Sequence, residues 1–139
     1  MKIFIICSKY FYDRVEAVRK SLEEKGHTII LPNSYEDPFI EERIKKLSHE
    51  EHISWKREML KLSEEKVRES EALLVLNYEK NGQKNYVGGA TFLEMFKGFE
   101  FGKILYMYNP VPEGMLKDEI EGMSPLVING DLEKIIERS

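Results

Sequence analysis

Short apolar runs alternate with charged, amphipathic segments along the chain. The runs Lys2 to Cys7, His27 to Leu31 and Ala72 to Leu76 are rich in aliphatic and β-branched residues, which is typical of strands buried on both faces. Ile104 to Tyr108 and Leu126 to Ile128 have the same character. Five such strands, separated by segments of helical pattern, predict an α/β fold around a parallel sheet.

Helices are predicted between these runs. Val15, Val18 and Leu22 recur at helical spacing, which predicts a helix from about Tyr12 to Lys25. The charged stretch from about Phe39 to Ser70 also has a helical pattern. A break in this stretch is predicted near Leu47–Ser48, where Ser48 to Glu51 has the form of a capping box. Further helices are predicted at 91–101 and near 117–121, and Asp131 is expected to cap a last helix.

The order of the elements predicts one domain over residues 1–139, a three-layer α/β sandwich with the flavodoxin-like (Rossmann-like) strand order 2-1-3-4-5. In that order the first and third strands are neighbours whose connections leave on opposite sides of the sheet. Ligands bind beyond the carboxyl ends of the strands at such a switch point. A site is therefore expected from Ser8 to Asp13 and from Asn77 to Glu94. The second segment includes a long loop, and long loops are often functional.

Composition and charge limit the classes of partner that the chain is expected to bind. The chain has 21 Lys and Arg against 25 Asp and Glu, a net charge of -4, and its basic residues do not form a stripe, which argues against a nucleic-acid polymer as partner. His27, His49 and His52 show no spacing typical of a metal site, so neither a metal nor another cofactor is expected. A small molecule is the expected ligand.

The cellular setting is also predicted. The single cysteine, Cys7, cannot form an internal disulfide, and the first residues lack the features of a signal peptide, so a cytoplasmic location is expected. The apolar runs are much shorter than the ~20 residues of a transmembrane helix. No contact with a membrane is therefore expected.

The segment from Tyr86 to Glu94 is the strongest candidate for chemistry. Gly88, Gly89 and Thr91 lie where a helix begins, and the free N–H groups there favour an anion or a hydroxyl-rich sugar. Glu94 follows one turn later and can point back to the same mouth. The alternative interpretation is a capping box in which Thr91 and Glu94 only satisfy backbone donors.

Other candidate substrate contacts flank the same edge of the sheet, and each has a structural alternative. Ser8 and Asp13 are each a ligand contact or a helix cap. Asn77 contacts a base or ribose, or belongs to a turn. Tyr10 and Tyr86 contact the substrate or orient Glu94, or they pack in an aromatic cluster.

A set of short segments within about residues 2 to 108 carries a family resemblance. The most specific is Ala90-Thr91-Phe92-Leu93-Glu94, followed by Gly102-Lys103. Phe11-Tyr12-Asp13-Arg14, Asn33-Ser34-Tyr35 and Glu71-Ala72 support it. Together they resemble the nucleoside 2-deoxyribosyltransferase family and its relatives, the 2'-deoxynucleoside 5'-phosphate N-hydrolases.

The resemblance implies that Glu94 is a nucleophile that attacks C1' of a 2'-deoxyribosyl group and displaces the base, after which water or a second base takes the sugar. It also implies a homo-oligomer. Three positions depart from the family pattern: Phe96 stands where glycine is usual, Ile5 where some relatives carry an orienting tyrosine, and Asn77 where many place an acid.

Several alternatives remain open at this stage. The residues do not decide between transferase and hydrolase or whether a 5'-phosphate is needed, and the general acid is unassigned. A nucleotide- or nucleoside-binding sensor or regulatory module of the same fold, without glycosidic chemistry, is the main rival. Flavodoxin, receiver-domain and P-loop functions are disfavoured, because the chain lacks their phosphate loop, acidic cluster and GxxxxGK[ST] motif respectively.

Overall fold

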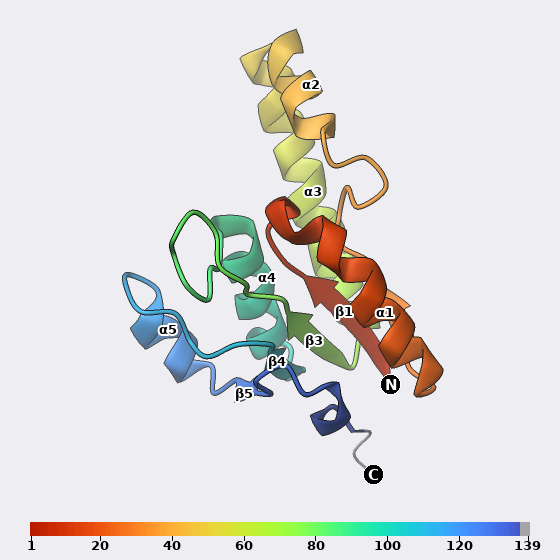
Figure 1. Cartoon of the computed structure of the whole chain (residues 1–139). Coiled ribbons are helices and arrows are strands. Elements are labelled where there is room, and N and C mark those ends of the chain that lie inside the picture. Colours follow the sequence, from red (N-terminus) through yellow and green to blue (C-terminus); the bar gives the residue numbers. More distant parts are fainter. Residues whose placement is uncertain (137–139) are drawn as a thin grey trace.

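The computed structural model describes residues 1–136 as a five-stranded parallel sheet with helices on both faces (Figure 1). The strands lie in the order β2-β1-β3-β4-β5, which confirms the predicted order. Every pair of neighbouring strands is parallel. The strands are β1 Lys2–Ile6, β2 Thr28–Ile30, β3 Ala72–Val75, β4 Ile104–Met107 and β5 Leu126–Val127.

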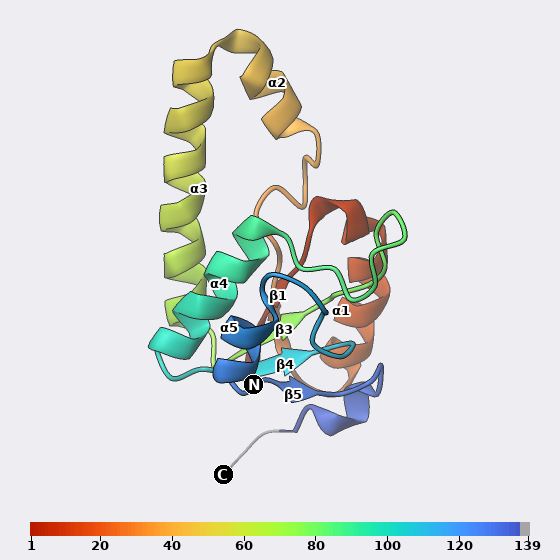
Figure 2. The same ribbon diagram turned by 90° about the vertical axis from the view of Figure 1, so that its left-hand side faces the viewer.

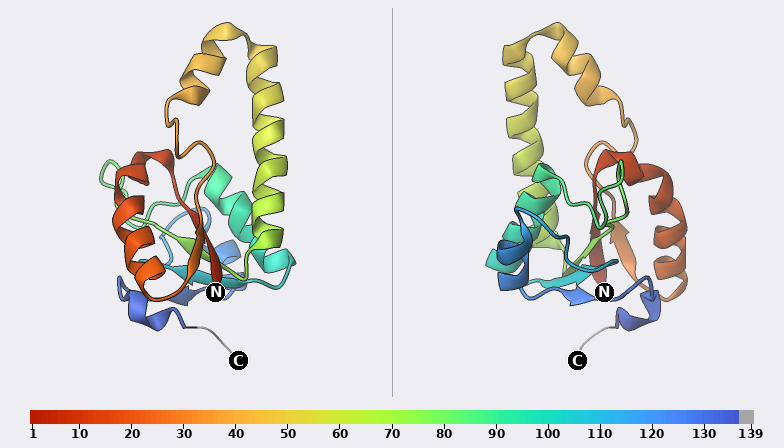
Figure 3. Two further views of the ribbon diagram at one scale, coloured as in Figure 1. Left: turned by 90° about the vertical axis from the view of Figure 1, so that its right-hand side faces the viewer. Right: turned by 60° about the vertical axis from the view of Figure 1, so that its left-hand side comes forward.

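The helices form a layer on each side of the sheet, as the predicted sandwich requires (Figure 3). Helix α1 (Val15–Glu24) follows a short 3-10 helix, η1 (Lys9–Arg14), and packs on one face. On the other face lie α3 (His49–Glu69), α4 (Gly89–Glu100) and α5 (Lys117–Gly122). The site described below lies on the side of α3 and α4.

Successive residues of a strand pack against the helices on opposite faces of the sheet. Ile5 packs with Val15 beneath α1, whereas the next residue, Ile6, packs with Val67 and Met95 beneath α3 and α4. All five side chains are fully buried. Burial of each side chain contributes roughly 1.5 to 3 kcal/mol to the stability of the fold. The loops at the carboxyl edge are therefore attached to a stable, well-packed sheet.

A helical hairpin rises above the carboxyl edge of the sheet (Figure 2). It consists of α2 (Ile40–Leu47) and the upper half of the 21-residue α3. Ser48 separates the two helices in an extended conformation, and its Oγ accepts a hydrogen bond from the Glu51 N–H at 3.0 Å. The predicted break at Leu47–Ser48 is confirmed, because the extended backbone of Ser48, the N-cap residue of α3, ends α2.

Two helix predictions need correction. The predicted helix from Tyr12 begins instead as η1 and becomes an α-helix only at Val15, where no side chain caps it, so Asp13 is not its N-cap. The last helix is only a 3-10 turn, η2 (Leu132–Lys134), although Asp131 caps it as expected. Residues 137–139 lie outside the described part of the chain. Within residues 1–136, no helix combines the length and the apolar character needed to cross a membrane.

Candidate functional site

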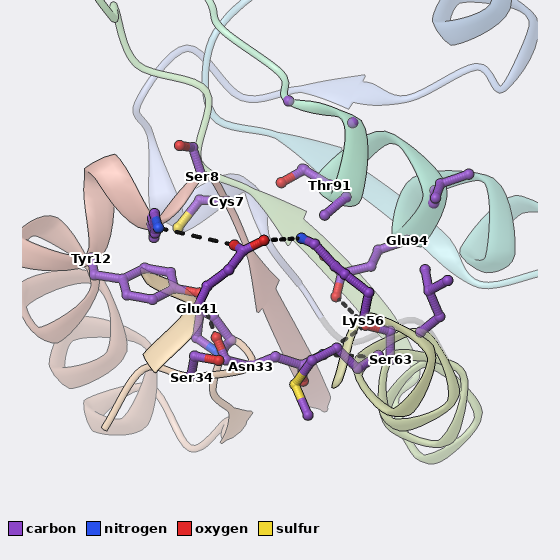
Figure 4. A pocket seen from close by; sticks show the side chains of 18 of the residues that line it. Cys7, Ser8, Tyr12, Asn33, Ser34, Glu41, Lys56, Ser63, Thr91 and Glu94 are labelled. Carbon is purple, nitrogen blue, oxygen red and sulfur yellow. Dashed lines mark hydrogen bonds and ion pairs between the residues drawn. The ribbon is translucent and has the colours of Figure 1, made fainter. Parts of the chain in front are cut away.

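A cavity of about 780 Å³ opens above the carboxyl ends of β1 and β2, between the start of α4 and the α2–α3 hairpin (Figure 4). Five parts of the chain supply its walls: the end of β1 with η1, the segment after β2, the start of α2, the inner face of α3, and the part of α4 up to Lys97. The cavity volume lies within the range of small-ligand sites, roughly 300 to 1,000 Å³. Its polar lining includes Ser8, Tyr12, Asn33, Glu41, Lys56, Ser63, Thr91 and Glu94.

Glu94 projects from α4 into this cavity toward α3 (Figure 4). Its Oε2 accepts a hydrogen bond from the Ser63 hydroxyl at 2.8 Å. Burial raises the pKa of Glu94 to about 7, although the Ser63 bond and the nearby Lys66 ammonium act in the opposite direction. A carboxyl group with a pKa near neutrality in a ligand-sized cavity is a candidate for catalysis.

The capping-box interpretation of Thr91 and Glu94 is wrong. Helix α4 begins at Gly89, two residues before the predicted start, and its N-cap residue Gly88 makes no side-chain capping bond. Thr91 is therefore the third residue of the helix and is only 3% exposed. The Glu94 carboxylate bonds to Ser63 on another helix rather than to the backbone of its own.

The structure brings five of the sequence-predicted site residues together: Ser8, Gly88, Gly89, Thr91 and Glu94 all line the cavity. Ser8 also caps η1, since its Oγ accepts a hydrogen bond from the Tyr10 N–H at 3.3 Å. The helix-cap interpretation of this serine is thus confirmed, and its contact with a ligand stays a prediction. The other predicted contacts, Tyr10, Asp13, Asn77 and Tyr86, do not line the cavity.

Asn77 is fully buried and ties the end of β3 to the segment after β4. Its Nδ2 donates to the carbonyl oxygens of Asn109 and Pro110, both at 3.0 Å, and its Oδ1 accepts from the Asn109 N–H at 2.9 Å. Every strong hydrogen-bonding position of the amide except one lone pair is thus used within the protein. The geometry assigns Asn77 a structural role.

Tyr10 and Tyr86 both pack near the Phe11 ring, with ring centres 5.6 Å and 6.5 Å away. The Lys80 ammonium lies 5.6 Å from the centre of the Tyr10 ring and 4.7 Å from that of Tyr86. Lys80 itself belongs to a small hairpin closed by Asn81 and Gly82, both with positive φ, as a type I' turn requires. Most of the long loop after β3 is therefore a separate hairpin, and only its last residues reach the cavity.

The wall opposite α4 carries a charge cluster that the sequence patterns did not reveal (Figure 4). The Glu41 carboxylate lies 2.8 Å from His52 Nε2 and 2.9 Å from Lys56 Nζ, and 4.0 Å from Lys9 Nζ. Burial alone would raise the pKa of Glu41, but the bonds from His52 and Lys56 outweigh it and lower that pKa. Glu41 lies on α2, Lys9 lies in η1, and His52 and Lys56 lie one turn apart on α3, so the cluster forms only where these elements pack together.

Within residues 1–136, no three His, Cys, Asp or Glu side chains are grouped so that they could hold a metal ion. Searches with this sequence find no matching protein-family model and no matching curated protein.

Proposed function

We propose that the chain cleaves or transfers the N-glycosidic bond of 2'-deoxynucleosides or their 5'-monophosphates through a covalent deoxyribosyl-glutamate intermediate. The observation that carries this proposal is the Glu94 carboxylate, which lies in a ligand-sized cavity and accepts a hydrogen bond from Ser63. A site that only binds a nucleoside can also use a carboxylate, to accept hydrogen bonds from sugar hydroxyls, and the base-release assay below separates the two functions. A retaining glycosidic reaction requires such a carboxylate.

In the proposed reaction, a Glu94 oxygen forms a bond to C1' as the bond from C1' to the base nitrogen breaks. The base leaves with the electron pair of that bond and takes a proton from water. Negative charge on Glu94 stabilises the oxocarbenium-like transition state. Water or a second base then attacks C1', which releases Glu94 as a carboxylate and gives net retention at the sugar.

The rest of the cavity supports a polar ligand. Ser8, Thr91 and the backbone of Gly88 and Gly89 lie at the end near α4 and are suited to sugar hydroxyls or a phosphate. The ammonium group of Lys56 lies on the opposite wall. These donors suit a nucleoside and its 5'-monophosphate equally, so the phosphate requirement is a question for experiment.

The decisive experiment is a panel of base-release assays. The purified protein is incubated with each 2'-deoxynucleoside and each 5'-monophosphate, with and without a second free base, and the released base is separated by chromatography. Release without a second base indicates a hydrolase, and release only with one indicates a transferase. If a nucleoside or nucleotide binds in calorimetry but no base is released, the function is that of a binding or sensor module instead.

The proposed reaction should depend on pH through Glu94. Because the carboxylate must be ionised to attack C1', kcat is expected to rise with pH and to reach half its plateau near pH 7, where Glu94 titrates. Rates measured from pH 5 to 9 under saturating substrate test this. A profile that is flat over this range, or that falls as pH rises toward 7, would contradict the assignment of Glu94 as nucleophile.

We also propose that the chain forms a homo-oligomer through the apolar rim, defined as Leu60, Leu93 and Phe96. These side chains border the cavity and are 52%, 49% and 45% exposed. They come from α3 and α4, which pack against each other, so they form one surface. A second copy over this rim would remove about half of each side chain from water.

Replacing Phe96 with glutamate is expected to shift the protein to monomers, since it would place a charge in the proposed contact. Sedimentation equilibrium over a range of concentrations measures the association constant, which should fall at least about tenfold. Met115→Glu is the matched control, because Met115 is also an exposed apolar residue but does not line the cavity. A wild-type protein that stays monomeric at high concentration would refute the proposal.

A further inference from the structure

Asn33, Ser63 and Glu94 form a chain of hydrogen bonds across three elements (Figure 4). Asn33, in the segment after β2, donates from Nδ2 to Ser63 Oγ at 2.8 Å. Ser63, on α3, donates to Glu94 Oε2 at 2.8 Å. Because a hydroxyl has one proton, the bond received from Asn33 leaves the Ser63 proton for the carboxylate.

Asn33 also removes the alternative partner of Ser63. A serine within a helix commonly donates to the carbonyl four residues earlier, which here is that of Met59. The Met59 carbonyl oxygen instead accepts a hydrogen bond from Asn33 Nδ2 at 3.1 Å. One amide group thus occupies the acceptor that would compete with Glu94 and at the same time donates to the Ser63 oxygen.

This arrangement leaves one polar atom unsatisfied. Asn33 Oδ1 is buried without a hydrogen-bond partner. An unpartnered buried acceptor is unfavourable, and such groups in folded proteins call for an explanation. Turning the amide over would place its oxygen 3.1 Å from the Met59 carbonyl oxygen, an unfavourable contact between two acceptors. The Tyr12 hydroxyl donates to the backbone carbonyl of Asn33 and so helps to hold the backbone of this segment in place.

We propose that Asn33 is a positioning residue that acts on Glu94 through Ser63, by directing the Ser63 hydroxyl to Glu94 Oε2 and leaving Oε1 to attack the substrate. Within residues 1–136, no hydrogen bond from the protein reaches Oε1. The part of this inference that concerns attack rests on the proposed function. The part that concerns the hydrogen-bond chain does not.

The test is a double-mutant cycle read on Glu94 itself. Its carboxyl titration is followed by carbon-13 NMR in the wild type, in Asn33→Ala, in Ser63→Ala and in the double variant, with Glu94→Gln to assign the signal. Ser63→Ala is expected to raise the pKa of Glu94 by roughly one unit, because the charged form loses a donor. Asn33→Ala should raise it too, since Ser63 is then free to donate to Met59.

The double variant separates positioning from a merely structural role. If Asn33 acts through Ser63, adding Asn33→Ala to Ser63→Ala causes no further change in the pKa of Glu94. An unchanged pKa in Asn33→Ala, or an equal rise in both backgrounds, overturns the proposal. The other titratable groups near Glu94, which are Lys66, Cys7 and Tyr12, are the same in all variants.

Two more variants keep the test decisive. Asn33→Asp preserves the side-chain shape but accepts the Ser63 proton, so the pKa of Glu94 should rise further than in Asn33→Ala. Ser54→Ala removes an exposed serine from the same helix and should leave that pKa unchanged. A rise in Ser54→Ala equal to that in Ser63→Ala, or no rise in Asn33→Asp, counts against the proposal.

Failure of this inference is distinguishable from failure of the proposed function. If the wild type releases no base from any substrate, the proposed function fails, while the titrations still decide whether Asn33 controls Glu94. If base is released, Asn33→Ala should move the midpoint of the kcat profile to higher pH by the same amount as the NMR titration. If Asn33→Ala lowers kcat but does not shift the midpoint of its pH profile, Asn33 has only a structural role.

Discussion

Glu94→Gln is expected to abolish base release, with a loss in kcat of at least about 10⁴-fold. The amide cannot attack C1', yet it has the shape of the carboxylate, and its oxygen can still accept the hydrogen bond from Ser63. Substrate affinity should therefore change little. Single-turnover base release measures the first quantity and calorimetry the second.

Two outcomes would contradict this prediction. Residual release within tenfold of the wild type would show that another group is the nucleophile. Loss of ligand binding along with release would show that Glu94 is needed to hold the ligand, so the assay would no longer isolate its chemical role. Glu65→Gln, an exposed change on α3, is the control that should alter neither quantity.

The same substitution should stabilise the fold at high pH. The pKa of Glu94 is raised from 4.5 to about 7, so the folded state holds a proton that the unfolded chain releases. Wild-type stability therefore falls as pH rises from about 4.5 to 7. Glutamine avoids this loss of ~3 kcal/mol, an advantage that is present at pH 8 and absent at pH 4.

Urea unfolding of the wild type and of Glu94→Gln at pH 4 and pH 8 measures this difference. The midpoints should lie close together at pH 4, and the variant should unfold at clearly higher urea at pH 8. An equal difference at both values would mean that packing, and not the buried charge, sets the effect. Glu65→Gln serves again as the control, since an exposed carboxylate should give no pH-dependent difference.

Asn77→Ala is expected to cost about 3 kcal/mol in the free energy of unfolding. The change leaves the carbonyl oxygens of Asn109 and Pro110 and the Asn109 N–H without the partner they have now. Thermal and urea unfolding measure the loss. Below its melting temperature the variant should bind ligand as the wild type does, because Asn77 does not line the cavity.

Gln83→Ala is the matched control for Asn77, since it removes an exposed amide side chain from the loop that follows β3. It should change neither stability nor affinity. If Asn77→Ala instead keeps wild-type stability and loses ligand binding, Asn77 belongs to the substrate site, as the sequence analysis predicted. The position therefore discriminates sharply between the ligand-binding and the structural interpretation.

Much of the fold could be predicted because its signals are local. Strands such as β1 and β3 are buried on both faces, so each appears as an unbroken apolar run. The break before α3 depends on Ser48 and a backbone group only three residues away. The position of Glu94 near the carboxyl edge then followed from the strand order, which the alternation of strands and helices already implied.

The surroundings of Glu94 could not be predicted in the same way. Ser63 precedes Glu94 by 31 residues, and the two meet only because α3 packs against α4. Locally, Thr91 and Glu94 match a capping box, and nothing in that pattern shows that α4 begins earlier, at Gly89. Likewise, Asn77 has the composition of a turn, but its partners follow the next strand.

The sequence by itself therefore determined the strands, their order, and which glycines and carboxylate lie near the carboxyl edge of the sheet, because periodicity and turn chemistry act over a few residues. Only the tertiary structure decided which groups face Glu94 and which predicted contacts turn away from the cavity. The physical reason is that the pKa of a buried carboxyl and its hydrogen bonds depend on neighbours brought together by packing, at sequence separations where no periodic pattern persists.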